Sequence, residues 1–237
     1  MAAIVMLSQT MIEAVTVVAF RFKRYQNPGH HDSGNECCDP QPWLFWDPCN
    51  DCDNRFIVCF DTVSNDLNLH PCTYGSFSTN RLIADDDDFY FPSPLAPLDE
   101  NDDDIPNPYY FTTSNWQDGF RVKIQVWDYD PTNADDLVDE LGFNFVGSQY
   151  QPAANEGAAT TWNEEILHDG QQSTYVITVE VKIYCEDHYY GPENGCATYC
   201  LPRDDDLGHY DCDSVTGSKV CHPGYVGENC EQITTSS

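Results

Sequence analysis

Residues 200–212, with the sequence CLPRDDDLGHYDC, bring two cysteines, a histidine, an arginine and four aspartates into thirteen positions. Asp, His and Cys side chains can supply a base and a nucleophile to an enzyme, or ligands to a metal ion. The same residues are also typical of a surface loop whose ends are joined by a disulfide. The segments around this loop indicate whether it is an active site, a metal site or a disulfide-closed surface loop.

The cysteines are even in number, twelve in all, and fall into two groups, with none in residues 73–184. Two dense clusters predict disulfides formed in an oxidising compartment. Zinc is the alternative, because Cys49 and Cys52 have the Cys-x-x-Cys spacing. No second close pair of Cys or His residues follows in that cluster, which favours disulfides. The two groups are Cys37, Cys38, Cys49, Cys52, Cys59 and Cys72, then Cys185, Cys196, Cys200, Cys212, Cys221 and Cys230.

The formal net charge of −30, from 40 acidic and 10 basic residues, limits the partners of the chain. Nucleic acid is excluded as a partner, because phosphate binding needs a basic surface. A simple electrostatic contact with anionic lipid is disfavoured for the same reason. Calcium is the ion that clustered carboxylates suit best, and a solvated acidic surface is the alternative for most of them.

The first residues, 1–14, are apolar but interrupted by Gln9 and Glu13, and they predict a weak or truncated signal segment. No later stretch is long and apolar enough to span a bilayer. Either the chain is complete and soluble, or it is a fragment whose anchor lies beyond Ser237.

The middle of the chain predicts a mainly β fold. Residues 56–60, 120–127 and 174–184 are rich in Val, Ile and aromatic side chains, and the last two segments alternate apolar with polar positions. Residues 85–108 have the composition of a mobile acidic loop, and only residues 133–141 suggest a helical turn. Several strands with long loops and few helices predict an antiparallel β-sandwich.

Two loops of this predicted sandwich carry spaced aspartates. Asp47 and Asp53 precede one strand, while Asp128 and Asp130 end another strand and Asp136 follows six residues later. Carboxylates that leave a strand at alternate positions can turn onto one ion. The pattern resembles the calcium-binding loops of C2 domains, and we expect a calcium site there. The alternatives are that these aspartates only form turns and caps, or that a disulfide inside the first loop sets its shape without metal.

The C-terminal segment carries three further motifs. They are Cys-x3-Tyr-Tyr-Gly from Cys185, then Cys-x3-Cys-x-Pro-Arg-Asp-Asp-x-x-Gly-His-Tyr-x-Cys from Cys196 to Cys212, and Cys-x-x-Gly-Tyr-x-Gly-x-x-Cys from Cys221 to Cys230. Together they resemble the DSL domain of Notch ligands, the Delta and Serrate/Jagged families.

The upstream residues resemble the domain that precedes DSL in this family, a C2-like sandwich, through Cys37-Cys38, the strand ending at Cys59 and PCTYGS at 71–76. The resemblance implies a C2-like antiparallel β-sandwich over residues 15–184, a small disulfide-rich, EGF-related DSL module over 185–230, and a tail over 231–237.

The resemblance also implies the chemistry of the second module. It implies the disulfides Cys185–Cys196, Cys200–Cys212 and Cys221–Cys230, since six cysteines allow 15 connectivities and spacing alone cannot choose between them. A disulfide between Cys200 and Cys212 removes both as nucleophiles, so we expect no enzyme. Gly208 is expected to adopt a backbone angle that other residues cannot reach.

The same resemblance implies that loop 200–212 contacts the EGF-like repeats of a Notch receptor. The contact positions map to Leu201, Arg203, Asp205 and Leu207. The family usually has Arg at the first of these positions and often an aromatic residue at the last.

The expected function is that of an extracellular or cell-surface Notch ligand, or an N-terminal fragment of one, in cell–cell communication. The alternatives are a soluble secreted decoy without an anchor and a calcium-dependent C2 protein that binds membrane lipid through its loops.

Overall fold

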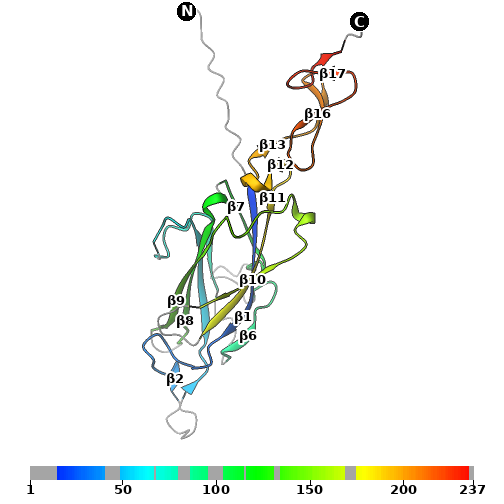
Figure 1. Cartoon of the computed structure of the whole chain (residues 1–237). Helices are drawn as coiled ribbons and strands as arrows, with labels where there is room; N and C mark the ends of the chain where they lie inside the picture. Colours follow the sequence, from blue (N-terminus) through cyan, green and yellow to red (C-terminus); the bar gives the residue numbers. More distant parts are fainter. Residues whose placement is uncertain are drawn as a thin grey trace, which may run out of the picture.

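The protein is a β-sandwich followed by a small disulfide-rich module that extends from one end of it (Figure 1). The computed structural model describes residues 15–40, 49–66, 68–79, 86–95, 104–114, 116–130, 134–168 and 175–234, so the expected signal segment 1–14 lies outside the described residues. The mainly β fold class is confirmed. Within the described ranges, each helix is too short to cross a bilayer.

The first sheet has five strands built around β1. Strand β1 pairs antiparallel with β11 along nearly its whole length. On its other edge it pairs with β7 over residues 16–20 and with β6 over residues 24–26. Strand β10 extends the sheet beyond β11. The strands are β1 (Thr16–Gln26), β6 (Asp88–Tyr90), β7 (Tyr109–Thr113), β10 (Asn163–Leu167) and β11 (Val176–Cys185).

The second sheet has four antiparallel strands in the order β5-β4-β8-β9. Its central strand β8 alternates as the sequence predicts, and Val122, Ile124 and Val126 are fully buried. The strands are β4 (Asn54–Asp61), β5 (Gly75–Ser78), β8 (Phe120–Asp128) and β9 (Asp136–Phe145). The sandwich also has a short strand pair, β2 (Asp39–Pro40) and β3 (Cys49–Asn50), and two 3-10 turns, η1 (Trp116–Asp118) and η2 (Glu156–Ala158).

The helical turn expected within residues 133–141 is wrong, because β9 occupies residues 136–145. Trp127 pairs with Leu137 and Val126 with Asp139, so Val138 is an extra residue that interrupts the ladder as a β-bulge. The bulge breaks the two-residue alternation of the strand. Buried side chains therefore recur at 138, 141 and 145, with the spacing of three and four that is typical of a helix.

The acidic segment 85–108 is more ordered in its described part than its composition suggests. Phe89 in β6 is buried, and Leu95 and Ile105 are buried and joined by an isolated β-bridge. These apolar residues pack into the sandwich core. The core therefore anchors the described part of this acidic segment.

The core between the sheets is dominated by aromatic rings. Phe20 from β1 packs edge-on against Phe60, at 5.1 Å between ring centroids, and against Phe145, at 5.7 Å. Phe120 stacks on Phe145 at 4.6 Å. All four rings are fully buried, and such pairs stabilise a core beyond the effect of the buried area alone.

A buried ion pair lies at the end of the sandwich nearer the small module. The Nζ atom of Lys123 lies 2.7 Å from the Oδ2 atom of Asp61, and both side chains are almost wholly buried. Lys123 also donates to the carbonyl of Asn68, and Thr73 and Asn65 donate to the carboxylate of Asp61. The pair therefore fixes the β4–β5 loop, whose base is also closed by the disulfide Cys59–Cys72.

Two further disulfides lie at the opposite end of the sandwich, where the sequence left the pairing open. Cys37 pairs with Cys49, and Cys38 pairs with Cys52. The adjacent cysteines 37 and 38 thus tie the chain after β1 to the segment before β4 at two successive positions. The zinc alternative for Cys49 and Cys52 is not what this structure shows.

The small module is made of three short antiparallel pieces and one 3-10 turn. The first is β12 with β13, the second is the three-stranded sheet β14-β15-β16, and the third is β17 with β18. The last strand lies beyond residue 230, where the tail was expected to begin. The elements are β12 (Tyr189–Tyr190), η3 (Pro192–Asn194), β13 (Thr198–Tyr199), β14 (Arg203–Asp205), β15 (Gly208–Cys212), β16 (Lys219–Cys221), β17 (Tyr225–Val226) and β18 (Gln232–Ile233).

The junction between the two units is covalent and hydrogen-bonded. Cys185, the last residue of β11, is buried and forms a disulfide with Cys196 in the small module. The hydroxyl of Thr16, the first residue of β1, donates to the carbonyl of Gly195 at 3.2 Å. The first and last strands of the sandwich therefore both hold the start of the module.

Substitution of Lys123 by Met is expected to destabilise the sandwich by about 3–5 kcal/mol, because it leaves the carboxylate of Asp61 buried without its cation. Equilibrium unfolding in denaturant with the disulfides intact measures this change. The matched control is Lys182→Met on β11, since that side chain is only half-buried and lies over the ring of Trp162. A change in the free energy of unfolding no larger than that of the control would contradict the prediction.

The ion pair of Lys123 and Asp61 also makes the stability of the sandwich depend on pH in the acidic range. Burial alone would raise the pKa of Asp61, but hydrogen bonds from Lys123 and Thr73 outweigh it and hold this pKa well below its ordinary value. A lowered folded-state pKa means that the stabilisation is present above the unfolded pKa, near about 4, and is lost as the pH falls below it. In Lys123→Met the unfolding free energy should therefore decline less on acidification.

Candidate functional site

Loop 200–212 folds into a tight β-hairpin. Strand β14 pairs with β15 so that Arg203 faces Tyr210 and Asp205 faces Gly208, which leaves Asp206 and Leu207 as the two-residue turn. Leu207 at the tip is 66% exposed. An apolar side chain held this far into solvent contributes little to folding, so it is available for contact with another protein.

The aspartates of the hairpin shape its backbone. The Oδ1 atom of Asp205 accepts a hydrogen bond from the amide of Leu207 at 2.8 Å, which closes the turn around the tip. The Nε atom of Arg203 lies 3.7 Å from Oδ2 of the same aspartate. Arg203 and Asp205 are two residues apart on β14 and so share one face of the hairpin.

Leu201 precedes β14 and is also exposed, at 42% of its surface. The four positions implied as receptor contacts therefore lie on β14, on the turn that follows it and on the chain that leads into it. Pro202, between Leu201 and Arg203, is exposed as well, so the approach to the hairpin is open.

The histidine that suggested an active site has structural partners. The Nδ1 atom of His209 contacts Oδ1 of Asp204 across the hairpin, and the ring stacks on Tyr225 with 3.8 Å between centroids. The hydrogen bond from His209 holds the pKa of Asp204 below its ordinary value. The Nδ1 atom of His222 lies 3.6 Å from the same carboxylate oxygen. Every described cysteine is in a disulfide, so this histidine has no thiol to activate.

The disulfides of the small module pair as the family resemblance implies. They join Cys185 with Cys196, Cys200 with Cys212 and Cys221 with Cys230. The second bond ties the two ends of the hairpin loop, and Cys200, Tyr210 and Cys230 form the small buried cluster beneath it.

The reason for a glycine at position 208 differs from the expected one. Gly208 does not have the positive φ of Gly191, Gly224 or Gly227. It is buried instead under a close approach: a Cβ atom there would lie 2.4 Å from the carbonyl oxygen of Asn229 and 2.8 Å from the ring of Tyr210. Packing, and not backbone angle, excludes larger residues here.

The aspartates predicted to bind calcium are partly brought together. The amide of Asp53 donates to Oδ1 of Asp128 at 2.6 Å, and both side chains are buried. Asp136 pairs with Asp128 across β8 and β9, but its side chain is exposed. The amide of Asp130 donates a hydrogen bond to Oδ1 of Asp135 at 3.4 Å. Asp47 lies outside the described residues.

Within the described ranges, no group of three ligand atoms includes Asp53, Asp130 or Asp136. The Oδ1 atom of Asp128 already accepts a hydrogen bond from the amide of Asp53. Calcium binding by this set stays a prediction.

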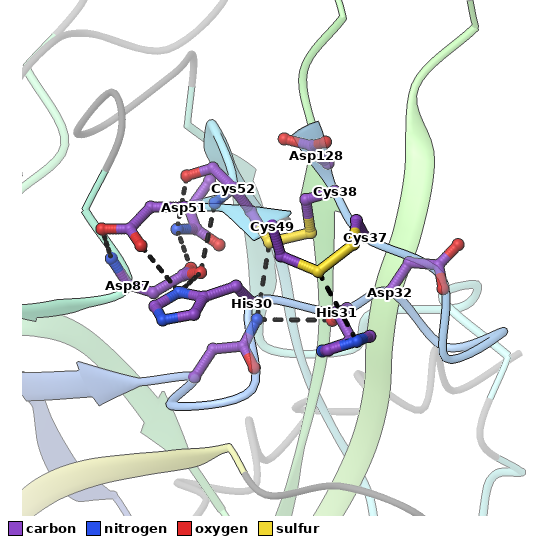
Figure 2. Close-up of a disulfide and its surroundings, with 12 residues drawn as sticks. His30, His31, Asp32, Cys37, Cys38, Cys49, Asp51, Cys52, Asp87 and Asp128 are labelled. Atoms are coloured by element: carbon purple, nitrogen blue, oxygen red, sulfur yellow. Dashed lines mark hydrogen bonds and ion pairs between the residues drawn. A yellow bond between two sulfur atoms is a disulfide. The ribbon is translucent and has the colours of Figure 1, made fainter. Parts of the chain in front are cut away.

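A different polar group lies at the same end of the sandwich, and the sequence pattern did not reveal it. The Nδ1 atom of His30 lies 2.6 Å from Oδ1 of Asp51 and 3.1 Å from Oδ2 of Asp87 (Figure 2). The three residues come from three separate segments with no shared spacing. Only the fold brings them together, so no local motif could have predicted the group.

Comparison with known proteins identifies both units. A family model described as the N terminus of Notch ligand C2-like domain matches residues 16–181, and one described as Delta serrate ligand matches residues 185–233. The first match alone covers more than half of the chain. The chain belongs to the Notch ligand family.

Relatives of this Notch ligand include human Delta-like protein 1, which is 30% identical over 186 residues covering 78% of this chain and 24% of the relative. Human jagged-1 is 25% identical over 186 residues, covering 77% of this chain and 13% of the relative. The chain thus spans about a quarter or less of the length of these relatives.

The solved structure of Drosophila C2-DSL-EGF1 is similar to this Notch ligand, with a TM-score of 0.64 and 24% sequence identity. The similarity covers 92% of this chain and 87% of the other. At that identity it shows the fold alone, and it agrees with a C2-like sandwich followed by a DSL module.

Gly208→Ala is expected to push the turn end of the hairpin away from the neighbouring chain, because the new Cβ would overlap the Asn229 carbonyl. Amide hydrogen exchange measures the effect. The amide of His209, which donates to Cys230, should lose protection, while amides of β8 in the sandwich keep theirs. Unchanged protection at His209 would show that the neighbouring chain moves aside at little cost.

For the calcium prediction, binding to the folded state should raise the melting temperature, since ligand at 100 times Kd adds about 2.7 kcal/mol to the unfolding free energy. Thermal melts with calcium and with a chelator test this. The shift should vanish in Asp128→Asn with Asp136→Asn. If the parent shows no shift, these aspartates only shape the loops.

Proposed function

We propose that this chain is the N-terminal, receptor-binding part of an extracellular Notch ligand, and that it binds an EGF-like repeat of a Notch receptor through the hairpin formed by β14 and β15. Family membership supports the ligand role. Disulfides in both units support an oxidising, extracellular location. Ligands of this kind act by binding, which agrees with a non-enzymatic function.

The observation that carries the proposed contact is the exposure of Leu207 on a rigid hairpin. The turn is closed by Asp205, the base is tied by Cys200–Cys212, and the ring of Tyr210 is buried beneath it. A rigid loop loses little conformational entropy when it binds, so most of its contact energy appears as affinity. Arg203 and Asp205 would add polar contacts beside the apolar tip.

Leu201 and Leu207 distinguish this ligand from the usual family pattern of arginine and an aromatic residue. Arginine and aromatic side chains are common hot spots of protein interfaces, whereas leucine is under-represented there. We propose that these positions still contact the receptor, through a smaller and more apolar surface. Binding of membrane lipid by the loops of the sandwich stays a prediction.

Leu207→Ala is expected to weaken binding to purified Notch EGF-like repeats about tenfold, since loss of a buried apolar side chain costs at least about 1.4 kcal/mol. Biolayer interferometry on immobilised repeats measures the dissociation constant. Leu207→Phe, which restores an aromatic side chain, should bind as well as the parent or more tightly.

The matched control is Val215→Ala, because Val215 is exposed to a similar extent, at 61%, in a different turn of the same module. It should bind as the parent does. If Leu207→Ala also binds as the parent does, the receptor contact lies elsewhere, and the loop end of the sandwich becomes the better candidate.

A further inference from the structure

Three segments that are far apart in sequence meet at the end of the sandwich opposite the small module. They are the chain after β1, the chain before β4 and the chain before β6, and they contribute His30, Asp51 and Asp87. Figure 2 shows these three side chains pointing toward one another beside the two disulfides. One imidazole nitrogen and two carboxylate oxygens all lie within 4.8 Å of one another.

Asp87 is fixed by groups outside this trio. Its side chain is only 2% exposed. Its Oδ1 atom accepts from the side-chain amide of Asn54 at 2.9 Å, and its Oδ2 atom accepts from the amide of Cys52 at 3.1 Å. Hydrogen bonds of this kind hold the carboxylate ligands of metal sites in a set orientation.

The other two residues are held by the disulfide Cys38–Cys52. Asp51 is the neighbour of Cys52, and the amide of Cys38 donates to the carbonyl of His30 at 3.2 Å. The side chains of His30 and Asp51 are each 31% exposed, so they are reachable from solvent. The geometry of the trio is therefore set before any ligand arrives.

A small cavity of about 110 Å³ opens beside the trio. Its described lining consists of Gln26, Asn27, Pro28, His30, Asp51, Asp86, Asp87 and Asp88. These residues supply four carboxylates and one imidazole, and none of them is a lysine or arginine. Asp88 is neutralised by Arg24 at 2.7 Å, which leaves three carboxylates and one imidazole.

Within the described part of the chain, the carboxylates of Asp51 and Asp87 form ion pairs with His30 alone. Burial raises the pKa of Asp87, and the nearby charge of Asp51 raises it further. A protonated His30 can offset one negative charge at most. A divalent cation would offset two.

The donor set selects the type of cation. Calcium prefers shells of oxygen atoms alone, whereas zinc and related ions take imidazole nitrogen together with carboxylate oxygen. Donors bound at about 2.0–2.1 Å to one tetrahedral ion lie roughly 3.3 Å apart. The 3.1 Å from His30 Nδ1 to Asp87 is close to that value, and the 2.6 Å to Asp51 is a hydrogen-bond distance that would widen when an ion replaces the imidazole proton.

The neighbouring groups do not offer a comparable site. His31 lies near Cys37 and Cys49, and Asp128 lies near Cys38 and Cys52. All four of these cysteines are oxidised in disulfides, and a metal ion needs the thiolate.

We propose that His30, Asp51 and Asp87 form a binding site for a divalent transition-metal ion of the zinc type, with water from the adjoining cavity completing its shell. The ion would tie together the three segments that cap this end of the sandwich. The proposal uses different residues from the predicted calcium set, and it does not rest on receptor binding.

The test uses the full chain, treated with chelator and then dialysed. Titration calorimetry with zinc chloride should show one site per chain, and zinc should raise the melting temperature more than equimolar calcium. His30→Asn and Asp51→Asn should each weaken zinc binding about tenfold or more. Asparagine suits position 30 because His30 has a positive φ of 53°, a region that asparagine tolerates.

His31→Asn is the matched control, since it removes the adjacent imidazole, which lies 3.7 Å from Sγ of Cys49 and outside the trio. It should bind zinc as the parent does. The proposal is overturned if zinc binding and the thermal shift persist in the double variant His30→Asn with Asp51→Asn, or if the control loses zinc to the same extent. A protein that binds no zinc would show that His30 only forms an ion pair with the two carboxylates.

Discussion

The hairpin formed by β14 and β15 depends on the disulfides of the small module. The main buried cluster of that module has only Cys200, Tyr210 and Cys230 at its centre, which is too little apolar surface to hold a unit of this size. Three disulfides replace the missing core, each typically contributing about 2–4 kcal/mol. Because they set the hairpin, Leu207 can remain exposed at its tip.

Disulfides act in a similar way at the other end of the molecule. Phe20, Phe120 and Phe145 pack between the sheets toward the small module, and Tyr25 and Phe56 continue this aromatic core at the far end. Beside these rings, polar segments are joined by Cys37–Cys49 and Cys38–Cys52. Disulfides thus hold polar segments at both ends of the molecule.

Much of the fold could be predicted from the sequence, because the strands and the cysteine motifs are local patterns. Val122, Ile124 and Val126 alternate as a half-buried strand should, and the DSL motif placed Leu207 on an exposed loop. The resemblance also implied the disulfide pairing of the second module.

The failures have specific physical causes. Val138 is a bulge, so β9 shows a helical spacing although it is a strand. Gly208 is required by the nearby Asn229 carbonyl, a contact that no local pattern shows.

The calcium prediction and the zinc-type trio both show that sequence patterns reveal only groups that are close together along the chain. Asp-x-Asp spacing marks carboxylates that are near in sequence, and it drew attention to Asp128 and Asp130. His30, Asp51 and Asp87 are separated by more of the chain and meet only because β1 ends, and β4 and β6 begin, at the same end of the sandwich. Long-range contacts of this kind depend on topology, which a single sequence does not display.

Strand β1 runs between the two ends of the sandwich for which we propose a receptor contact and a metal site (Figure 1). Its first residue, Thr16, bonds to Gly195 at the junction with the DSL module, and Asn27, just after its last residue, donates to the carbonyl of Asp87. Coupling between two sites requires an element with two arrangements that both sites bias. Strand β1 is paired with β11 along one edge and with β6 and β7 on the other, so it is held in one register. An ion at the far end would therefore stabilise the sandwich locally, and the affinity of the hairpin for a receptor should depend on its own disulfides and side chains.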